Sequence, residues 1–148
     1  MQVTYGKGFA VAQTQRQKID NLQAEVAKLP QYEPITEHFF HGGMYCRKVW
    51  RDADVLVVGK VHKKEHFYLI VSGRLLIEKQ EYGPGALILS QPGTKRAVYS
   101  LEPTVCMTFH RTDATTVEAA ETELVEEEEN TMYTLGNQLK LTKIEVTP

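Results

Sequence analysis

The chain has 148 residues, of which 42% are hydrophobic and 24% are charged, as is ordinary for one globular domain with a sizeable core. Its net charge is −2, and its lysines and arginines are spread along the chain among acids, which argues against general nucleic-acid binding. No stretch approaches the ~18 apolar residues that cross a bilayer, and no secretory signal pattern is seen, so we expect a cytoplasmic protein with no membrane partner.

A helix is predicted over residues 10–29, which contain neither proline nor glycine. Ile19, Leu22, Val26 and Leu29 recur at three- and four-residue spacing and form one narrow apolar stripe. That stripe packs either on the same domain, which we favour, or on a second copy. Pro30 ends the helix.

The next segments hold a histidine pair and an alternating run. His38 and His41 could ligate a metal, but Pro34 and the pair Gly42-Gly43 bound them, so we interpret the stretch as a loop. Residues 44–50 then alternate between two sets, and either set can face inward. One set is Met44, Cys46, Lys48 and Trp50; the other is Tyr45, Arg47 and Val49. If the second set faces inward, Tyr45 and Arg47 add a phenol and a cation to a cavity; otherwise Arg47 is solvated.

His62 and His66 lie four residues apart in a short charged turn between two predicted strands. Val55, Val57 and Val61 alternate before the pair, and residues 67–71 are β-branched and aromatic after it. Neutral imidazoles held by rigid strands can aim at one cation. The pair therefore predicts a divalent-metal site, for iron, zinc, nickel or manganese.

Further short strands are predicted over residues 74–79, 86–89 and from Val105 to Arg111, with turns at residues 82–85 and 91–93. The second turn delivers Arg96 to the following strand, and alternation places His110 opposite Met107 and Phe109. Short strands separated by turns predict a sandwich or barrel rather than βαβ units. Cys46 and Cys106 lie in strand-like apolar runs, so we expect reduced thiols rather than a disulfide.

The end of the chain predicts a short acidic helix and a last strand. Asp113 is the expected N-cap, Val117, Ala120 and Leu124 follow at helical spacing, and the helix ends at the glutamates of residues 126–129. Residues 138–146 predict an edge strand or an arm to a partner.

The glycine spacing resembles that of the cupin superfamily. The first motif of that superfamily runs His-x-His, three or four residues, Glu, six residues, Gly. When Gly73 is aligned with the final glycine of this motif, His66 stands at the position of its glutamate. His62 then stands at its second histidine and Lys60 at its first. The second motif matches at Gly85 and Gly93, and Arg96 stands at its histidine position. Arginine stays protonated and cannot ligate a metal, so the family's four-ligand set is broken. The resemblance covers roughly residues 42–110 and extends to the small cupins carried by phages.

This resemblance implies an all-β fold: a single cupin-type antiparallel β-barrel, or jelly roll, with an N-terminal helix and a short C-terminal helix. The expected domain spans residues 1–148, with a barrel core at about 42–111 and an extension from 112. If the alternation holds, one cavity collects the side chains of Lys60, His62, His66, Tyr68, Arg96 and His110.

Three functions follow as hypotheses. In the first, the protein binds a small anionic molecule, a divalent metal or both, and sequesters or senses its ligand. His62, His66 and His110 bind the metal, and Lys60 and Arg96, with Tyr68, Tyr45 and Arg47 as further candidates, bind the anion; without a metal the same groups form a phosphate or carboxylate pocket. The second is a metal-dependent enzyme, a dioxygenase or isomerase, although alternation turns Glu65 away from the cavity. The third is a phage structural or virion-associated barrel, in the host cytoplasm if phage-encoded. We also expect a homodimer, formed through the helical stripe, the terminal strand or packed barrels.

Overall fold

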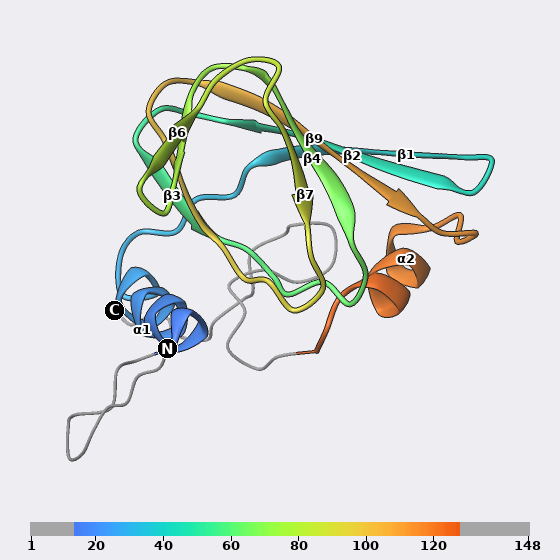
Figure 1. Ribbon diagram of the computed structural model, residues 1–148, viewed down its shortest axis with the longest axis horizontal. Helices are drawn as coiled ribbons and strands as arrows, with labels where there is room; N and C mark the ends of the chain where they lie inside the picture. The colour runs from blue at the N-terminus through green and yellow to red at the C-terminus, as the bar shows by residue number, and fades with distance from the viewer. Residues whose placement is uncertain (1–13, 128–148) are drawn as a thin grey trace, which may run out of the picture.

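The computed structural model describes residues 14–127, which form two helices and nine strands (Figure 1). In chain order these are α1 (Gln15–Val26), β1 (Ile35–His41), β2 (Met44–Arg51), β3 (Val55–Val58), β4 (His66–Ser72), β5 (Leu75–Ile77), β6 (Gln80–Tyr82), β7 (Leu87–Ser90), β8 (Ala97–Ser100), β9 (Thr104–Arg111) and α2 (Val117–Leu124). Neither helix has the length and hydrophobicity that crossing a membrane requires.

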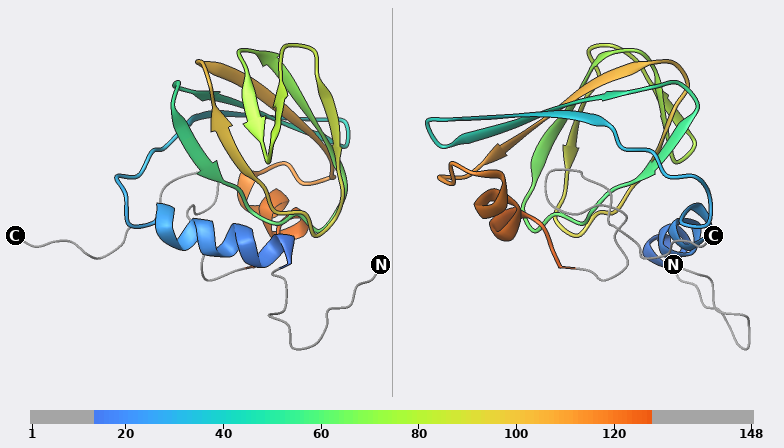
Figure 2. Two further views of the ribbon diagram at one scale, coloured as in Figure 1. Left: turned by 60° about the vertical axis from the view of Figure 1, so that its left-hand side comes forward. Right: turned by 180° about the vertical axis from the view of Figure 1, so that it is seen from behind.

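The strands form two antiparallel sheets that face each other as a barrel. One sheet has the order β1-β2-β9-β4-β7 and the other β3-β8-β5-β6. The two helices lie at the same end of this barrel, α1 near β3 and α2 near β2 and β9 (Figures 1 and 2). The prediction of a mainly β, antiparallel barrel with an N-terminal helix and a short C-terminal helix is therefore confirmed.

The strand register orders the inward side chains of the larger sheet into rungs. Tyr45 pairs with His110, and His66 pairs with Ser90, so these four polar groups share the rung nearest the helices. The next rung carries Arg47, Thr108, Tyr68 and Ile88. The third carries Val49, Cys106 and Ile70. The barrel interior is thus polar toward the helices and apolar beyond them.

This register also decides which face of β2 points inward, a question that alternation left open. Tyr45, Arg47 and Val49 are buried, whereas Met44 is exposed. Opposite them, Val57, Val98 and Ile77 line the smaller sheet, where Val98 pairs with both of the others. Burying each such aliphatic side chain stabilises the fold by about 1.5–3 kcal/mol.

Helix α1 docks on its own barrel, as favoured from its stripe. Thr14 caps it and forms a capping box with Gln17. Ile19 and Val26 pack against the valines of β3. A second attachment is the ion pair between Lys95 Nζ and Asp20 Oδ1 at 2.7 Å, in which the lysine side chain is fully buried. Leu22 and Leu29, the other members of the predicted stripe, are exposed.

Two predicted boundaries are wrong, and each has a local reason. Residues 38–41 are not a loop but the end of β1, because Gly42 and Gly43 both have positive φ and form the two-residue turn that pairs β1 with β2. The barrel sheet accordingly begins at Ile35 rather than at residue 42. Helix α2 is capped by Thr116, whose hydroxyl accepts from the Ala119 amide, and not by Asp113.

Other differences are smaller. Strand β6 was not predicted, and β3 ends at Val58, before Val61. Both cysteines are free. The described residues leave out residues 10–13 of the first predicted helix, residues 128 and 129 of the predicted glutamate run and the predicted strand over 138–146.

Gly73, the first-motif glycine, occupies a position that only glycine fits. Its φ is +84°, and an added Cβ would lie 2.2 Å from the Pro103 carbonyl oxygen. We expect Gly73→Ala to lower the free energy of unfolding by about 1–3 kcal/mol in urea titrations. Gly85→Ala is the matched control, because Gly85 has φ +90° but no atom within 4 Å of its added Cβ. A Gly73 variant no less stable than the Gly85 variant would contradict the steric argument.

Candidate metal centre and its cavity

Three imidazoles from separate parts of the fold meet at the polar end of the barrel. His62 lies in the loop between β3 and β4, His66 begins β4, and His110 lies near the end of β9. Their ring centroids are 4.3 Å (His62–His66), 4.5 Å (His66–His110) and 5.3 Å (His62–His110) apart. One ring nitrogen from each lies within 4.8 Å of the others. Because zinc–imidazole bonds are ~2.0–2.1 Å, nitrogens on one ion lie at most ~4.2 Å apart, so only small shifts separate this cluster from a ligand set.

All three rings are held neutral, which is the form that binds metals. Burial lowers the pKa of His62 to about 3, with His66 and Arg47 nearby adding to the effect. Burial also lowers the pKa of His66 to about 4, and that of His110 to about 2. At neutral pH each ring therefore keeps a lone pair that is free of a proton.

Two of the ring nitrogens have no hydrogen-bond partner among residues 14–127. They are His62 Nε2 and His66 Nδ1, both buried. Leaving a buried polar atom unsatisfied costs about 1–3 kcal/mol, so these atoms fit a bound cation better than an empty core. His110 Nε2 instead lies 2.8 Å from Thr108 Oγ1. Metal-ligating histidines commonly bond such a group through the ring nitrogen that does not bind the metal, and this bond fixes the orientation of the ring. The three residues thus fit a divalent metal.

Helix α2 and the turn after β7 hold the His62 loop in place. The Lys63 amide donates to the Leu124 carbonyl at 2.7 Å, and the Glu126 amide donates to the Val61 carbonyl at 2.9 Å. The Gly93 amide donates to the His62 carbonyl at 2.9 Å. The turn at Gly93, which belongs to the second cupin-like motif, therefore helps to hold His62, which belongs to the first, in position.

A cavity of about 100 Å³ lies beside the imidazoles. Its wall comprises Pro34, Arg47, Val49, Arg51, Val57, Gly59, Lys60, His62, His66, Tyr68, Ser90, Thr94, Arg96, Val98, Cys106 and Thr108. The predicted residues Lys60, His62, His66, Tyr68 and Arg96 all line it, together with Arg47. Tyr45 and His110 do not line it.

Arg96 is a cation of the cavity wall that makes no ion pair with a carboxylate of the described residues. Its Nη1 donates to the Ser90 hydroxyl, and Thr94 lines the wall near it. A guanidinium retains several further N–H donors after one such bond. Arg96 is therefore available to a ligand in the cavity.

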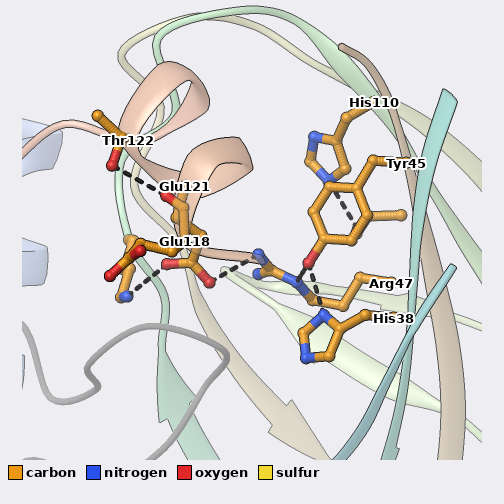
Figure 3. Close-up of polar contacts among 9 residues, drawn as sticks. His38, Tyr45, Arg47, His110, Glu118, Glu121 and Thr122 are labelled. Carbon is orange, nitrogen blue, oxygen red and sulfur yellow. Dashed lines mark hydrogen bonds and ion pairs between the residues drawn. The ribbon is translucent and has the colours of Figure 1, made fainter. Parts of the chain in front are cut away.

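Glu121 of α2 is a residue that the sequence analysis missed. Its carboxylate is 3% exposed and lies 3.1 Å from Arg47 Nη2 and 2.9 Å from Lys60 Nζ, as Figure 3 shows for its approach to Arg47. Two of the cations expected to hold an anion are thus already paired with the protein's own carboxylate. Helical spacing gave only a weak indication that Glu121 is buried: Glu121 follows Val117 by four residues and lies on the inward side of the helix with Ala120 and Leu124.

The two tyrosines have different places. The Tyr45 hydroxyl accepts from Arg47 Nε at 3.1 Å and lies 2.6 Å from His38 Nδ1 (Figure 3), while its ring stacks on His110. It therefore supports His110 and Arg47 from behind. The Tyr68 hydroxyl accepts from Arg51 Nη1 at 3.2 Å inside the cavity, and burial raises the pKa of Tyr68 to about 12, so this phenol stays protonated.

Comparison with known proteins gives a likeness of fold. The sequence matches no protein-family model and no curated protein. Among solved structures, KdgF from Halomonas sp. is 14% identical, with 57% of this chain and 84% of that chain covered and a TM-score of 0.50. The Cupin_2 domain of an XRE family transcriptional regulator from Enterobacter cloacae is 10% identical (56% and 100% covered, TM-score 0.47). A cupin superfamily protein from Desulfitobacterium hafniense DCB-2 is 11% identical (60% and 87% covered, TM-score 0.47). The likeness is one of fold, that of a cupin-type barrel, and the histidines of this chain form a cluster that could hold a metal ion.

Proposed function

We propose that this protein is a metal-binding cupin whose cavity takes a small organic anion, which it sequesters or senses. One observation carries the proposal: three neutral imidazoles, two with unpartnered buried nitrogens, meet beside a cavity that Arg96 also lines. The imidazoles supply metal ligands and the guanidinium supplies a fixed positive charge.

His62, His66 and His110 would hold the metal and leave it open positions on the cavity side. Such an ion acts as a Lewis acid that binds and polarises a ligand oxygen. An all-imidazole set suits zinc, iron, nickel or copper better than manganese, which prefers oxygen ligands. We therefore place manganese last among the metals that the sequence suggested.

The cavity's shape and lining favour a short carboxylate or phosphate ester. At about 100 Å³ it is smaller than the ~150 Å³ cavity that holds benzene in an engineered protein, so only a few non-hydrogen atoms fit. Arg96, Ser90 and Thr94 offer donors near the imidazoles, whereas Val49, Val57 and Val98 form an apolar wall. A ligand with an anionic head beside Arg96 and a small apolar body against the valines would match both parts of this lining.

A metal-dependent enzyme is the alternative. Iron oxygenases commonly use two histidines and one carboxylate, and no carboxylate joins the imidazole cluster within the described part of the chain. Glu65 is exposed, and Glu121 is engaged by Arg47 and Lys60. We therefore favour binding over oxygenase chemistry.

The test begins with metal analysis of protein purified without added metal. Calorimetry then measures the binding of zinc, iron, nickel and manganese to the apo protein. It next measures the binding of a panel of short carboxylates and phosphates to the metal-loaded protein. We expect one metal per chain and at least one anion that binds. If neither a metal nor any anion binds, the proposal fails and the barrel is a scaffold, as in the virion-associated alternative.

Arg96→Ala is expected to weaken anion binding by about 10- to 100-fold, the ~1.5–3 kcal/mol of a charge-assisted hydrogen bond, while metal affinity stays unchanged. The matched control is Lys64→Ala, which removes a positive charge near the His62 loop but outside the cavity, where Lys64 pairs with Glu123. Calorimetry with metal and then anion separates the two effects. Equal losses in both variants would mean that general charge, and not Arg96, attracts the anion.

A further inference from the structure

A second pocket, of about 450 Å³, lies between the edge strands β6 and β7. Each of these strands ends its sheet, and no strand ladder joins them in the described part of the chain. Gln80 pairs with Ile77, a buried residue of β5, so Gln80 and Tyr82 of β6 face the barrel interior, as Ile88 of β7 does from the other sheet. These inward-facing side chains line the pocket, which we call the outer pocket.

Arg96 connects the outer pocket to the cavity beside the imidazoles. Among the described residues it is the one that lines both of them. Its Nη1 donates to the Ser90 hydroxyl, which leaves further N–H donors on the same guanidinium. An anionic group held by Arg96 can therefore carry an organic group that lies in the outer pocket, where about 450 Å³ is open to it, and not in the cavity of about 100 Å³.

The wall of the outer pocket has an excess of positive charge. Lys79, in the turn between β5 and β6, lines it with Arg96, and neither side chain forms an ion pair with a carboxylate of residues 14–127. The acidic residue of the wall is Glu78, whose Oε2 accepts a hydrogen bond from Gln15 Nε2 at 3.3 Å. Two cations and one carboxylate favour an anion in this pocket.

The same wall has an apolar and aromatic side. Tyr82 and Ile88 pack against the buried core cluster of the barrel, and Ile77 belongs to that cluster. Small-molecule sites typically measure ~300–1,000 Å³ and combine apolar surface with a few polar groups, so the outer pocket has the size and the lining of such a site. An occupant with an anionic head and an organic body fits both sides.

We propose that the outer pocket binds the organic body of a phosphate monoester whose phosphate is held by Arg96 and Lys79. Such a phosphate carries almost two negative charges at neutral pH and has three acceptor oxygens, so it can bond a guanidinium and an ammonium at once. A planar body then packs on the ring of Tyr82. This inference rests on the proposed function only in taking Arg96 as an anion-binding group, and it requires no metal.

Calorimetry with the full chain compares phenyl phosphate with inorganic phosphate. Phenyl phosphate should bind about 10-fold more tightly, because its ring removes apolar surface from water in the outer pocket. Tyr82→Ala should lower the affinity for phenyl phosphate by about 3- to 10-fold and leave that for inorganic phosphate unchanged. Tyr99→Ala is the matched control: Tyr99 is also a half-buried tyrosine of the smaller sheet, but it lies outside both pockets and donates to Asp54 Oδ1.

Two further measurements keep the outer pocket apart from the metal centre and from folding defects. Lys79→Ala changes an exposed turn, so the chain should fold normally, and it should weaken both phosphates by about 3- to 10-fold. Protein treated with a chelator should bind phenyl phosphate as tightly as untreated protein, because none of the three imidazoles lines the outer pocket. Circular dichroism melting checks the fold of each variant, and Lys79→Ala decides the test if Tyr82→Ala does not fold.

Each outcome separates this inference from the proposed function. If phenyl phosphate binds no more tightly than inorganic phosphate, or if Tyr82→Ala and Lys79→Ala both leave its affinity unchanged, the outer pocket is not the site, whereas short anions that depend on Arg96 would still support the cavity. If phenyl phosphate depends on Tyr82 and Lys79 in a chain that takes up no metal, the outer pocket is supported and the metal centre is contradicted. Benzoate that binds as tightly as phenyl phosphate would overturn the choice of a phosphate ester.

Discussion

Replacing His66 by alanine should abolish tight metal binding. His66 lies between the other two imidazoles, 4.3 Å from His62 and 4.5 Å from His110 between ring centroids, so its loss leaves at most two ligands. Altering an outer partner of a metal ligand costs 10–100-fold in affinity, so losing a ligand itself should cost at least ~100-fold. Equilibrium dialysis of the variant against zinc and iron measures this loss.

His41→Ala is the control for the His66 variant. His41 ends β1, is exposed and belongs to no cluster of metal-ligating residues within positions 14–127. Its replacement should leave metal affinity unchanged, while Thr108→Val, which removes the hydroxyl beside His110, should cause an intermediate loss. Equal metal affinity in wild type and His66→Ala would mean that the three rings are a packed core and not a ligand set.

The barrel was predictable because its signals are local. Gly73 needs a positive φ, and Gly85 and Gly93 have one too, so the spacing of these glycines reports turns that any such barrel requires. Two-residue alternation then assigned His66, Tyr68 and His110 to the interior, since neighbouring side chains on a strand point to opposite faces. Alternation therefore placed His66 and His110 on one side, whereas His62, which lies in a loop, was placed by the resemblance of the glycine spacing to the first cupin motif.

The features that sequence could not supply depend on contacts between distant segments. On β2 both alternating sets mix apolar and polar residues, and only pairing with β9 shows that Arg47 is inside. Glu121 is 74 positions from Arg47 and stands in a helix with two other glutamates, Glu118 and Glu123, neither of which is buried. A buried carboxylate cannot be told from solvated ones until its cationic partners are located in space.

The ion pairs of Glu121 lead to the second large effect. Glu121→Ala is expected to lower the free energy of unfolding by about 3–5 kcal/mol, because Arg47 and Lys60 would lose this carboxylate while staying buried. Both cations are about a tenth exposed, so water cannot readily replace the carboxylate. Urea unfolding measures the loss, and Glu118→Ala on the exposed side of the same helix is the control, expected to change stability by less than ~1 kcal/mol.

A small anion should partly reverse the Glu121→Ala defect. Arg47 and Lys60 line the same cavity as Arg96, so removing the carboxylate exposes two further cations to any anion that enters. Ligands that bind only the folded state raise its stability with concentration. Acetate and formate, which match the lost carboxylate, should therefore stabilise Glu121→Ala more than the wild type, whereas a chloride control at equal ionic strength should not. If acetate stabilises both proteins equally, Glu121 is a structural counter-ion whose place the cavity's ligand cannot take.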